Sequence, residues 1–477
     1  MSNAITLDKG FNLKVVIYPP SKANTLDDFG DDVDVANGVD ITPMVQGFRY
    51  YESLNQIFLQ AELEIFDATN QIKNIFNSIG DKCGIRKYCI IDVIFPDPLT
   101  TTDSSVVSNN LQNNLRNTDF LIFNQKSSFY ISKISDQYVQ NTKSYYRIEL
   151  INKKLFLNLH KKVVKAYSGN ISDIVARVAK EELLSDITIS SEEKAAPINK
   201  YLAQRISPSD IIEFACRKSE WLNEKVSGKQ VNTADNNVDI QKKSVGYFFY
   251  EIYKPDGNGL QFRPIYKLLK PDPKDLNIVF NYEYSPLSPS EVEDNAPYKV
   301  YSMSYNRGTS NILEDANTGT IGKSVNRNRD PVTGTIRVTT ETIEVIKNPC
   351  DTYNFEEASE SVVKSIKIQE YNTQFVNECD PGNVSVTPIL RKNYDALLEY
   401  IRNRSVDVLV PGNLSLRVGN YITIAQAGTA AAENDPNKQS IVKTYLIVDL
   451  CHRVTDINRV YTDLKLCEIV PDGVSFQ

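Results

Sequence analysis

Residues 406–424 read VDVLVPGNLSLRVGNYITI, a stretch in which two glycine turns interrupt a run of alternating apolar residues. The apolar side chains alternate in 406–410 and again in 414–418, so each run is expected to show one face to a core. Residues 411–413 and 419–420 carry the proline, glycine and asparagine of reverse turns. The stretch therefore predicts three short strands joined by tight turns, which is the corner of a β-barrel and not an active site.

The length and composition favour a strand-rich protein of several domains. A chain of 477 residues is too long for one core and fits two or three domains. Its 26 Tyr and 19 Phe accompany a mean hydropathy of −0.34 and short runs rich in Val, Ile and Thr. The net charge of −7 and the pI near 5.3 argue against a phosphate-binding surface. Nucleic-acid binding is therefore not expected.

The first 158 residues read as strands interrupted by one helix and two long polar loops. The helix is predicted at 69–80, where apolar residues recur at helical spacing and Gly80 ends the element. The loop at 21–40 is rich in aspartate but lacks the spacing of a calcium loop, and the loop at 100–117 is polar and of low complexity. Strands are expected at 12–19, 48–52, 56–66, 86–95, 119–124, 128–134 and 145–151.

Residues 159–275 change to a mixed helix and strand pattern. Asn170 is expected to cap one helix, and Ser207 with Pro208 to begin another whose buried face extends to Trp221 and Leu222. The polar loop 227–243 follows. Residues 246–253 and 260–266 then pair through the turn KPDGNG as a β-hairpin.

Residues 276–477 return to strands and share an outline with the first part: strands, one amphipathic helix, then more strands. The helix is predicted at 387–403, and 317–329 is read as a glycine- and asparagine-rich connection. No repeat is visible at the level of single residues, so a duplication is suggested by architecture alone. Strands are expected at 298–305, 334–345, 361–369, 443–449 and 461–469.

The sequence offers little material for catalysis. The chain has two histidines, His160 and His452, and Cys451 and His452 are neighbours that point to opposite faces of a strand. No nucleophile elbow, metal-ligand spacing or phosphate loop is present. Adjacent glutamates are read as solvated pairs, and aromatic runs are read as sheet packing. The acidic pairs are 181–182, 192–193 and 356–357, and the aromatic runs are 50–51, 145–146 and 247–250.

The cysteines and the N-terminus point to folding in a cytoplasm. The seven cysteines are scattered without a C-x-x-C pair, so reduced and mostly buried thiols are expected. The N-terminus has no basic start followed by a long apolar run, and no segment is apolar for the roughly 18 residues that a bilayer span needs. The cysteines are Cys83, Cys89, Cys216, Cys350, Cys379, Cys451 and Cys467.

Three segments together carry a resemblance to a known family. Residues 206–221 (ISPSDIIEFACRKSEW), 246–262 (GYFFYEIYKPDGNGLQF) and 408–424 (VLVPGNLSLRVGNYITI) resemble the central baseplate hub proteins of contractile tails. This family includes the hub of T-even-like myophages, the phage late control protein D and the spike base of type VI secretion spikes. The resemblance spans the chain in the order of its elements, and about fifty residues match in pattern.

The resemblance implies a mainly β fold with α+β parts, in which two similar tube-forming β-barrel domains (1–158 and 276–477) flank a middle α/β domain (159–275). It implies a homotrimer whose six barrels surround an axial channel and adapt the six-fold tail tube to the three-fold central spike. DNA would pass through this channel without specific binding. The implied component belongs to the virion tail baseplate, is assembled in the host cytoplasm, and has no catalytic residue, no cofactor and no metal.

The implied partners are a central spike protein, encoded separately because no spike follows residue 477, and a tail tube or tube-initiator protein. Baseplate wedge and tape-measure proteins are further partners, for which the loops 21–40, 100–117 and 227–243 are candidate contacts, and no membrane insertion is expected.

Two other functions fit a β-rich chain. A tail-associated carbohydrate-active hydrolase would use paired carboxylates and predicts a deep pocket that holds an acid with a shifted pKa. A monomeric binding module would present exposed aromatic surface, and its oligomeric state distinguishes it from a hub.

Overall fold

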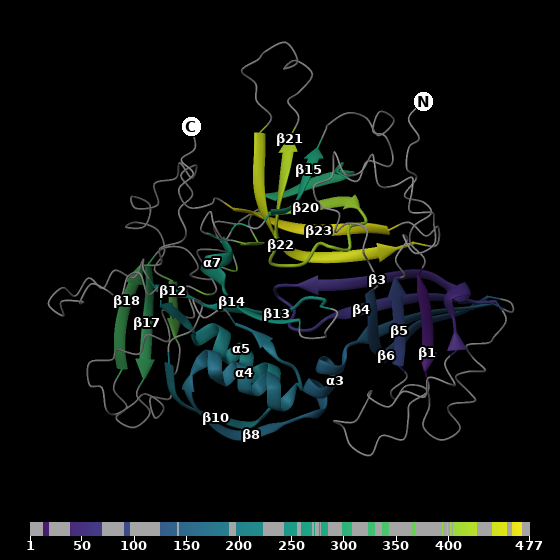
Figure 1. Cartoon of the computed structure of the whole chain (residues 1–477). Coiled ribbons are helices and arrows are strands. Elements are labelled where there is room, and N and C mark those ends of the chain that lie inside the picture. Colours follow the sequence, from purple (N-terminus) through teal and green to yellow (C-terminus); the bar gives the residue numbers. More distant parts are fainter. Residues whose placement is uncertain are drawn as a thin grey trace, which may run out of the picture.

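The computed structural model has a mainly β architecture, which confirms the predicted fold class (Figure 1). One 13-stranded sheet contains strands from both ends of the chain, and a middle segment with the long helices lies beside it. The structure describes residues 13–18, 39–68, 90–95, 125–140, 143–189, 197–222, 243–254, 259–269, 271, 276, 278–284, 298–307, 323–329, 336–342, 365–368, 394, 398, 401–402, 404–426, 441–455 and 460–469.

The first β-rich half is a curved sheet with the order β3-β4-β7-β6-β5-β1-β2, in which every neighbouring pair is antiparallel. A short 3-10 helix, η3 (Thr42–Met44), leads from β2 into β3. The strands are β1 (Lys14–Tyr18), β2 (Val39–Asp40), β3 (Val45–Ser53), β4 (Gln60–Asp67), β5 (Ile90–Phe95), β6 (Gln125–Gln140) and β7 (Lys143–Ile151).

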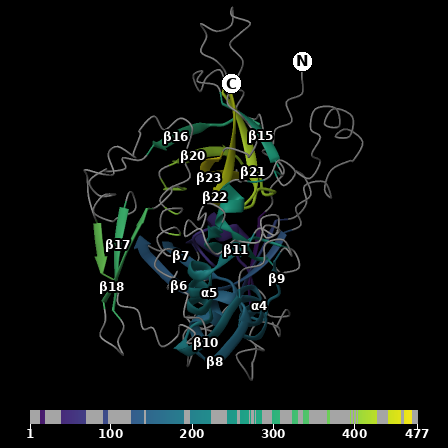
Figure 2. The same ribbon diagram turned by 90° about the vertical axis from the view of Figure 1, so that its left-hand side faces the viewer.

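The second β-rich half has the order β16-β20-β23-β22-β21-β15. A separate three-stranded sheet in the order β18-β17-β19 comes from the chain between β16 and β20, and Figure 2 shows β17 and β18 set apart from the main sheet. The strands are β15 (Ile278–Tyr284), β16 (Ser302–Arg307), β17 (Lys323–Arg329), β18 (Ile336–Thr342), β19 (Ser365–Ile368), β20 (Arg404–Pro411), β21 (Tyr421–Gln426), β22 (Ile441–Val454) and β23 (Val460–Ile469).

The two halves have the same strand topology. Taken in sheet order, β3-β4-β7-β6-β5-β1 corresponds position by position to β16-β20-β23-β22-β21-β15, and the chain visits both sets in the same sequence. Every corresponding pair up to β5 and β21 is antiparallel in both halves. The last strand differs, because β1 runs antiparallel to β5 whereas β15 runs parallel to β21. The shared outline read from the sequence is therefore a shared topology.

The correspondence extends to the hydrogen-bond register. The long hairpin β6–β7 has a bulge at Ser132, and the long hairpin β22–β23 has one at Val448. The two bulges are equivalent: each places one extra residue on the corresponding strand of its hairpin, β6 or β22. The pairs that flank them are Ile131–Leu150 and Lys133–Glu149 in the first half, and Ile447–Leu466 and Asp449–Lys465 in the second.

Each half has an apolar core, and the two cores interpenetrate at their junction. Leu414, Val454 and Val460 of the second half pack into the core of the first half, while Leu54 of the first half packs into the core of the second. Fully burying a side chain of this size contributes about 1.5–3 kcal/mol each. The junction is therefore a packed interior and not a surface contact.

The middle segment packs helices against small sheets. Helices α4 and α5 lie together, and the antiparallel ribbon β8–β10 packs against them, below them in Figure 1. Strand β13 is buried on both faces, because Phe248 and Tyr250 enter the core of the second half while Tyr247 and Phe249 enter the middle core. The elements are α3 (Lys153–His160), β8 (Val163–Asn170), α4 (Ile171–Glu182), β9 (Ile187–Thr188), β10 (Pro197–Ile206), α5 (Pro208–Lys218), β11 (Glu220–Leu222), β12 (Lys243–Val245), β13 (Tyr247–Glu251), β14 (Leu260–Pro264) and α7 (Ile265–Leu269).

The local signals of the middle segment are mostly confirmed. Ser207 caps α5 in a capping box with Asp210, and Pro208 occupies the first helical position. Asn170 lies at the N-cap of α4 as predicted, although its side chain accepts no hydrogen bond there. The predicted hairpin is the antiparallel pair β13–β14. Its second strand ends at Pro264, because the chain then turns into α7.

Several sequence predictions are wrong where tertiary contacts decide the conformation. Residues 414–418 are not a strand, although their alternate apolar residues are buried: 412–420 is a double turn, and β20 and β21 do not pair with each other. Trp221 lies in β11 and does not end α5, because the helix stops at Lys218. Part of the expected connection 317–329 is strand β17, which pairs with β18 and β19.

Other boundaries shift in the same way. The strand expected at 56–66 begins at Gln60, and the strands expected at 128–134 and 443–449 belong to the longer β6 and β22. The sequence did not indicate α3 or β15. The helix at 69–80, the strand at 119–124, the loop at 100–117 and most of the loops 21–40 and 227–243 lie outside the described residues. In the helix predicted at 387–403, the four described residues are helical.

Candidate functional site

The feature that unites the two halves is an antiparallel seam between β22 and β3. Residues 449–454 of β22 pair with residues 48–53 of β3, so the sheet continues from one half into the other (Figure 1). At the start of the seam the backbone N–H of Leu54 donates to the carbonyl of the bulged Val448 at 2.9 Å. Ser53 donates a side-chain hydrogen bond to Asp449. The seam therefore holds together segments from opposite ends of the chain.

An aromatic pair lies inside the seam. Tyr50 and His452 oppose each other in the register, and their rings stack with centroids 6.2 Å apart and planes at 13°. The Nδ1 atom of His452 lies 3.0 Å from the hydroxyl of Thr462. Burial, together with the nearby positive charge of Arg417, lowers the pKa of His452 to about 3. The imidazole is thus neutral over the physiological range.

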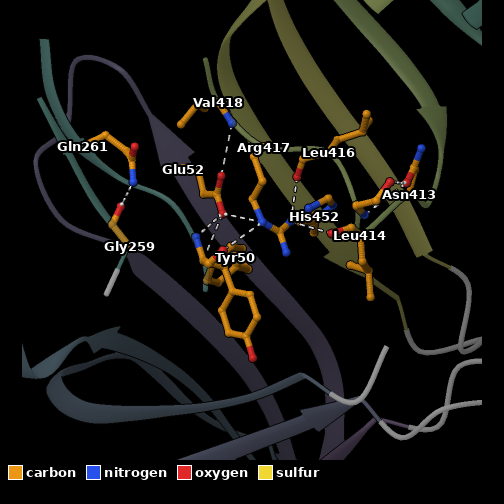
Figure 3. A network of polar contacts seen from close by, with 12 residues as sticks. Tyr50, Glu52, Gly259, Gln261, Asn413, Leu414, Leu416, Arg417, Val418 and His452 are labelled. Carbon is orange, nitrogen blue, oxygen red and sulfur yellow. Dashed lines mark hydrogen bonds and ion pairs between the residues drawn. The ribbon is translucent and has the colours of Figure 1, made fainter. Parts of the chain in front are cut away.

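Beside this pair, the carboxylate of Glu52 joins three parts of the chain (Figure 3). Glu52 is only 2% exposed. It accepts hydrogen bonds from the backbone N–H of Tyr253 at 2.9 Å, from that of Val418 at 3.2 Å and from the hydroxyl of Tyr50 at 3.2 Å. Tyr253 follows β13 of the middle segment, and Val418 lies in the double turn of the second half. One side chain therefore ties the first half to both other parts.

Arg417 is the cation that faces Glu52. Its Nε lies 3.6 Å from Oε1 of Glu52, and its side chain is 12% exposed. The guanidinium also donates to the carbonyls of Leu414, Leu416 and Tyr253 and lies 5.3 Å from the centre of the Tyr253 ring. These contacts satisfy carbonyls in the turn that residues 414–418 form in place of a strand.

Burial raises the pKa of Glu52 above its ordinary value, while Arg417, the two backbone donors and Tyr50 act against that shift. Burial opposes the charged form, and the surrounding donors stabilise it. The same burial raises the pKa of Tyr50 well above its usual range, and the neighbouring Glu52 adds to that shift. The donor set around Glu52 is what a structural buried carboxylate requires.

A second buried carboxylate, Glu251 at the end of β13, repeats this arrangement. It accepts from the side-chain amide of Asn152, from Lys154, and from the backbone N–H of Leu59 at 3.3 Å. Asn152 also caps α3, because its side-chain oxygen accepts from the backbone N–H of Leu155 at 2.9 Å. Glu251 therefore fixes the start of α3 and the loop before β4 to the hairpin.

The double turn at 412–420 depends on its glycines. Gly419 has φ +80°, and a Cβ there would lie 2.4 Å from the hydroxyl oxygen of Tyr250. A Cβ at Gly412 would lie 2.4 Å from Cβ of Val460. Asn413 stabilises the turn by accepting from the backbone N–H of Ser415 at 3.1 Å. The glycines that signalled a corner are thus required by close packing.

Neither histidine lies in a catalytic arrangement among the residues that the structure describes. The Nδ1 atom of His160 lies 2.9 Å from the carbonyl oxygen of Phe156, one turn earlier on α3. Cys451 and His452 occupy opposite faces of β22 as predicted, and burial raises the pKa of Cys451 to about 12. The described part of the chain holds no cluster of three or more His, Cys, Asp or Glu that could bind a metal.

The aromatic runs are packing residues for the most part, as the sequence indicated. Residues 247–250 are fully buried, and Tyr50 and Tyr146 belong to the core of the first half. Tyr145 is half-exposed and packs on Phe66 with ring centres 4.7 Å apart. Among the acidic pairs, Glu181 forms a surface ion pair with Lys165, and 192–193 and 356–357 lie outside the described residues.

A cavity of about 750 Å³ lies between α5, β13 and the strands of the second half. Its two described carboxylates are Glu213, which forms an exposed ion pair with Arg217, and Asp449 at the seam. Burial raises the pKa of Asp449, while Ser53 and Lys465 act against that shift. A glycosidase needs two carboxyls that flank one substrate bond. Glu213 pairs at the surface and Asp449 is held by Ser53, so this cavity does not support the hydrolase alternative.

The Glu52–Arg417 contact could not have been read from the sequence. Alternation in the segment FRYYES places Tyr50 and Glu52 on one face of a strand, but a glutamate at such a position usually marks solvent. No local signal connects Glu52 to Arg417, which belongs to the other end of the chain.

None of the helices in the described parts of the chain has the length and apolar character that crossing a bilayer requires.

Comparison with known proteins gives matches in structure alone. No protein-family model matches the sequence, and no curated protein matches it. A tail protein from Neisseria meningitidis MC58 aligns with a TM-score of 0.48 and 9% identity, covering 97% of this chain and 98% of that chain. A 43 kDa tail protein of a prophage from Shewanella oneidensis aligns with a TM-score of 0.44 and 8% identity, covering 95% of this chain and 98% of that chain.

A component of the type VI secretion system from Escherichia coli, described as similar in structure to T4 bacteriophage tail proteins, aligns with a TM-score of 0.39 and 7% identity. The alignment covers 91% of this chain and 76% of that chain. These structural neighbours are of the kind that the sequence resemblance predicted. All three TM-scores lie below 0.5 and all three identities below 10%, so the similarity by itself assigns neither a family nor a function.

Proposed function

We propose that this chain is the structural hub of a contractile-tail baseplate, a ring of three copies around an axial channel. One observation carries the proposal: two halves with the same strand order and the same bulge are joined side by side into one sheet. A chain built in this way presents two equivalent units. Three chains then present six units, which matches a six-fold tube on one face and a three-fold spike on the other.

The proposed domains follow from this arrangement. Residues 1–158 and 276–477 are the two tube-forming barrels, and residues 159–275 form the mixed domain beside them. We place the mixed domain on the outside of the ring, because it lies beside the main sheet and is attached to the junction by β13 and by the Glu52 and Glu251 contacts. A rigid junction is what a ring needs, since any hinge between the halves would change the diameter of the channel.

The charge of the chain fits a channel that DNA crosses without binding. The net charge is −7, and clustered Lys and Arg would instead retard a polyanion. The proposed partners are a central spike protein and a tail tube or tube-initiator protein, with wedge and tape-measure proteins around them. The proposed location is the virion tail baseplate, after assembly in the host cytoplasm, and the proposed role needs no catalytic residue, cofactor or metal.

The test is the mass of the purified full-length protein in solution. Light scattering behind size exclusion is measured for the protein alone and after addition of the spike candidate encoded beside it. A species near three times 53.9 kDa, alone or with the spike, supports the hub. A monomer under both conditions contradicts it and favours a monomeric binding module. A tetramer or an open-ended polymer also contradicts it, because neither matches three-fold symmetry with six units.

A further inference from the structure

We propose that neighbouring copies in the ring are joined by strand pairing: β16 of one copy lies antiparallel to the second part of β6 in the next copy. This contact would repeat the β22–β3 seam, in the same register. The inference rests on the proposed ring and adds to it the surfaces that meet and the residues that oppose each other. Its basis is the strand topology that the two halves of one chain share.

β22 shares one of its sides between two partner strands. Residues 441–446 of β22 pair with β21, and residues 449–454 on the same side pair with β3, while β23 occupies the opposite side. The bulge at Val448 lies between the two partners. On this side, the first part of β22 thus pairs with a strand of its own half, and the second part pairs with a strand of the other half.

β6 is the counterpart of β22, and among the described strands it lacks the second partner. Residues 125–130 of β6 pair with β5, and residues 130–140 pair with β7 on the opposite side. The bulge at Ser132 follows as it does at Val448. No described strand of the same chain pairs with β6 beyond this bulge on the β5 side. A sheet edge of this kind is a template for another strand.

β16 is the strand that fits this edge. β16 is the counterpart of β3 and ends the sheet order of the second half. Tyr305 opposes Val406 of β20, just as Tyr50 opposes Ala61 of β4. Val406 pairs with Leu466, and Ala61 pairs with Leu150. Each of these leucines pairs in turn with the residue just before the bulge of its hairpin. β16 therefore presents to a neighbouring copy the side that β3 presents to β22.

Burial supports this assignment independently of the topology. Tyr50 is 6% exposed under the seam, whereas its counterpart Tyr305 is 36% exposed. Leu450 is buried at the seam, and its counterpart Ile134 on β6 is only partly buried. Apolar side chains that are buried at the internal seam thus have more exposed counterparts on both of the surfaces that would meet between copies.

The register follows from the internal seam. Leu450 opposes Glu52, and Cys451 opposes Tyr51. The equivalent positions place Ile134 opposite Arg307, and Ser135 opposite Asn306 of the next copy. The register is carried no further than Ser135, because β6 has a second irregularity between Ser135 and Tyr138 that β22 lacks.

Cysteine cross-linking of the full-length protein tests this register. Directly opposed residues of an antiparallel pair have Cα atoms about 4.5–5.5 Å apart, within the range for a disulfide. In the double variant Ser135→Cys/Asn306→Cys, mild oxidation is expected to convert most of the one-chain band on a non-reducing gel into two-chain and three-chain bands. The internal control is Tyr51→Cys, which opposes the natural Cys451 and is expected to cross-link within one chain.

Two further controls fix the interpretation. Each single variant should remain mostly a one-chain band, and Ser135→Cys/Ser302→Cys should do the same, because four residues along a strand separate the two cysteines by about 13 Å. A trimer in solution without cross-linking of the opposed pair, or with equal cross-linking of the displaced pair, overturns the seam and leaves the ring standing. A monomer with and without the spike candidate overturns the ring, and the seam with it.

Discussion

Breaking the Glu52–Arg417 contact should cost more stability than breaking any of the surface ion pairs among the described residues. The perturbation is Glu52→Gln, which keeps the shape of the side chain and removes its charge. The carboxylate accepts from two backbone N–H groups and one hydroxyl while it faces the guanidinium of Arg417. A glutamine can present one oxygen, so its NH₂ group would face a backbone donor in a site that water does not reach.

The magnitude follows from these contacts. Leaving one buried donor without an acceptor costs about 1–3 kcal/mol. Removing one partner of a buried ion pair costs about 3–5 kcal/mol, because the other charge remains buried. Because the raised pKa of Glu52 means that burial already disfavours its charge, the unpaired donor is the main cost, and we expect Glu52→Gln to lower the free energy of unfolding by about 1–3 kcal/mol. That is an appreciable share of the roughly 5–15 kcal/mol typical of a folded protein.

The assay is a double-mutant cycle of Glu52→Gln and Arg417→Met in urea, followed by far-UV circular dichroism and by the fluorescence of Trp221. Coincident transitions justify a two-state free energy. The double variant should lose less than the sum of the single variants by about 1–3 kcal/mol, because it leaves neither charge buried alone. The matched control is Glu213→Gln, whose ion pair with Arg217 is half-exposed and should contribute at most about 1 kcal/mol.

The pH dependence supplies a second check with a definite sign. The folded-state pKa of Glu52 is raised above its ordinary 4.5, so the folded protein holds this proton more tightly than the unfolded chain. The resulting stability is present below pH 4.5 and is lost as the pH rises through the folded pKa. Relative to Glu52→Gln, the wild type should therefore lose stability with rising pH. An additive cycle, or a loss no larger than that of Glu213→Gln, would contradict the role assigned to Glu52.

Two further predictions concern the same junction. Because the folded-state pKa of His452 is about 3 against an ordinary 6.5, the wild type should lose about 1.4 kcal/mol per pH unit as the pH falls from 6.5 toward 3. Free energies of unfolding from urea titrations across this range should change with pH by about 1.4 kcal/mol per unit less in His452→Gln than in the wild type, and by the same amount in His160→Gln as in the wild type. An unchanged slope in His452→Gln would contradict the assignment. Gly419→Ala should cost about 2–4 kcal/mol, since it combines strain at φ +80° with a Cβ 2.4 Å from the hydroxyl of Tyr250. Gly169→Ala has φ +112° but no atom within 4 Å of its Cβ, so it should show the backbone strain alone, and equal losses of thermal midpoint in the two variants would rule out the clash.

Elements that depend on neighbours along the chain could be predicted from local patterns. The capping box of Ser207 and Asp210, the hairpin β13–β14 and the alternating strands β3, β20 and β23 follow from local patterns, because their decisive contacts lie within a few residues or within one turn. The mainly β class and the shared outline of the two halves could be predicted for the same reason.

The turns at 414–418 and the seam between the halves depend on residues far apart in the chain, so only the folded structure reveals them. Residues 414–418 alternate like a strand, yet they form turns, because Arg417 and Glu52 satisfy their backbone groups and the glycines allow close packing against Tyr250 and Val460. The seam between β22 and β3 joins segments with no common local signal. Alternation tells which face of a strand is buried but carries no information about which strand lies beside it, and that choice belongs to the folded chain alone.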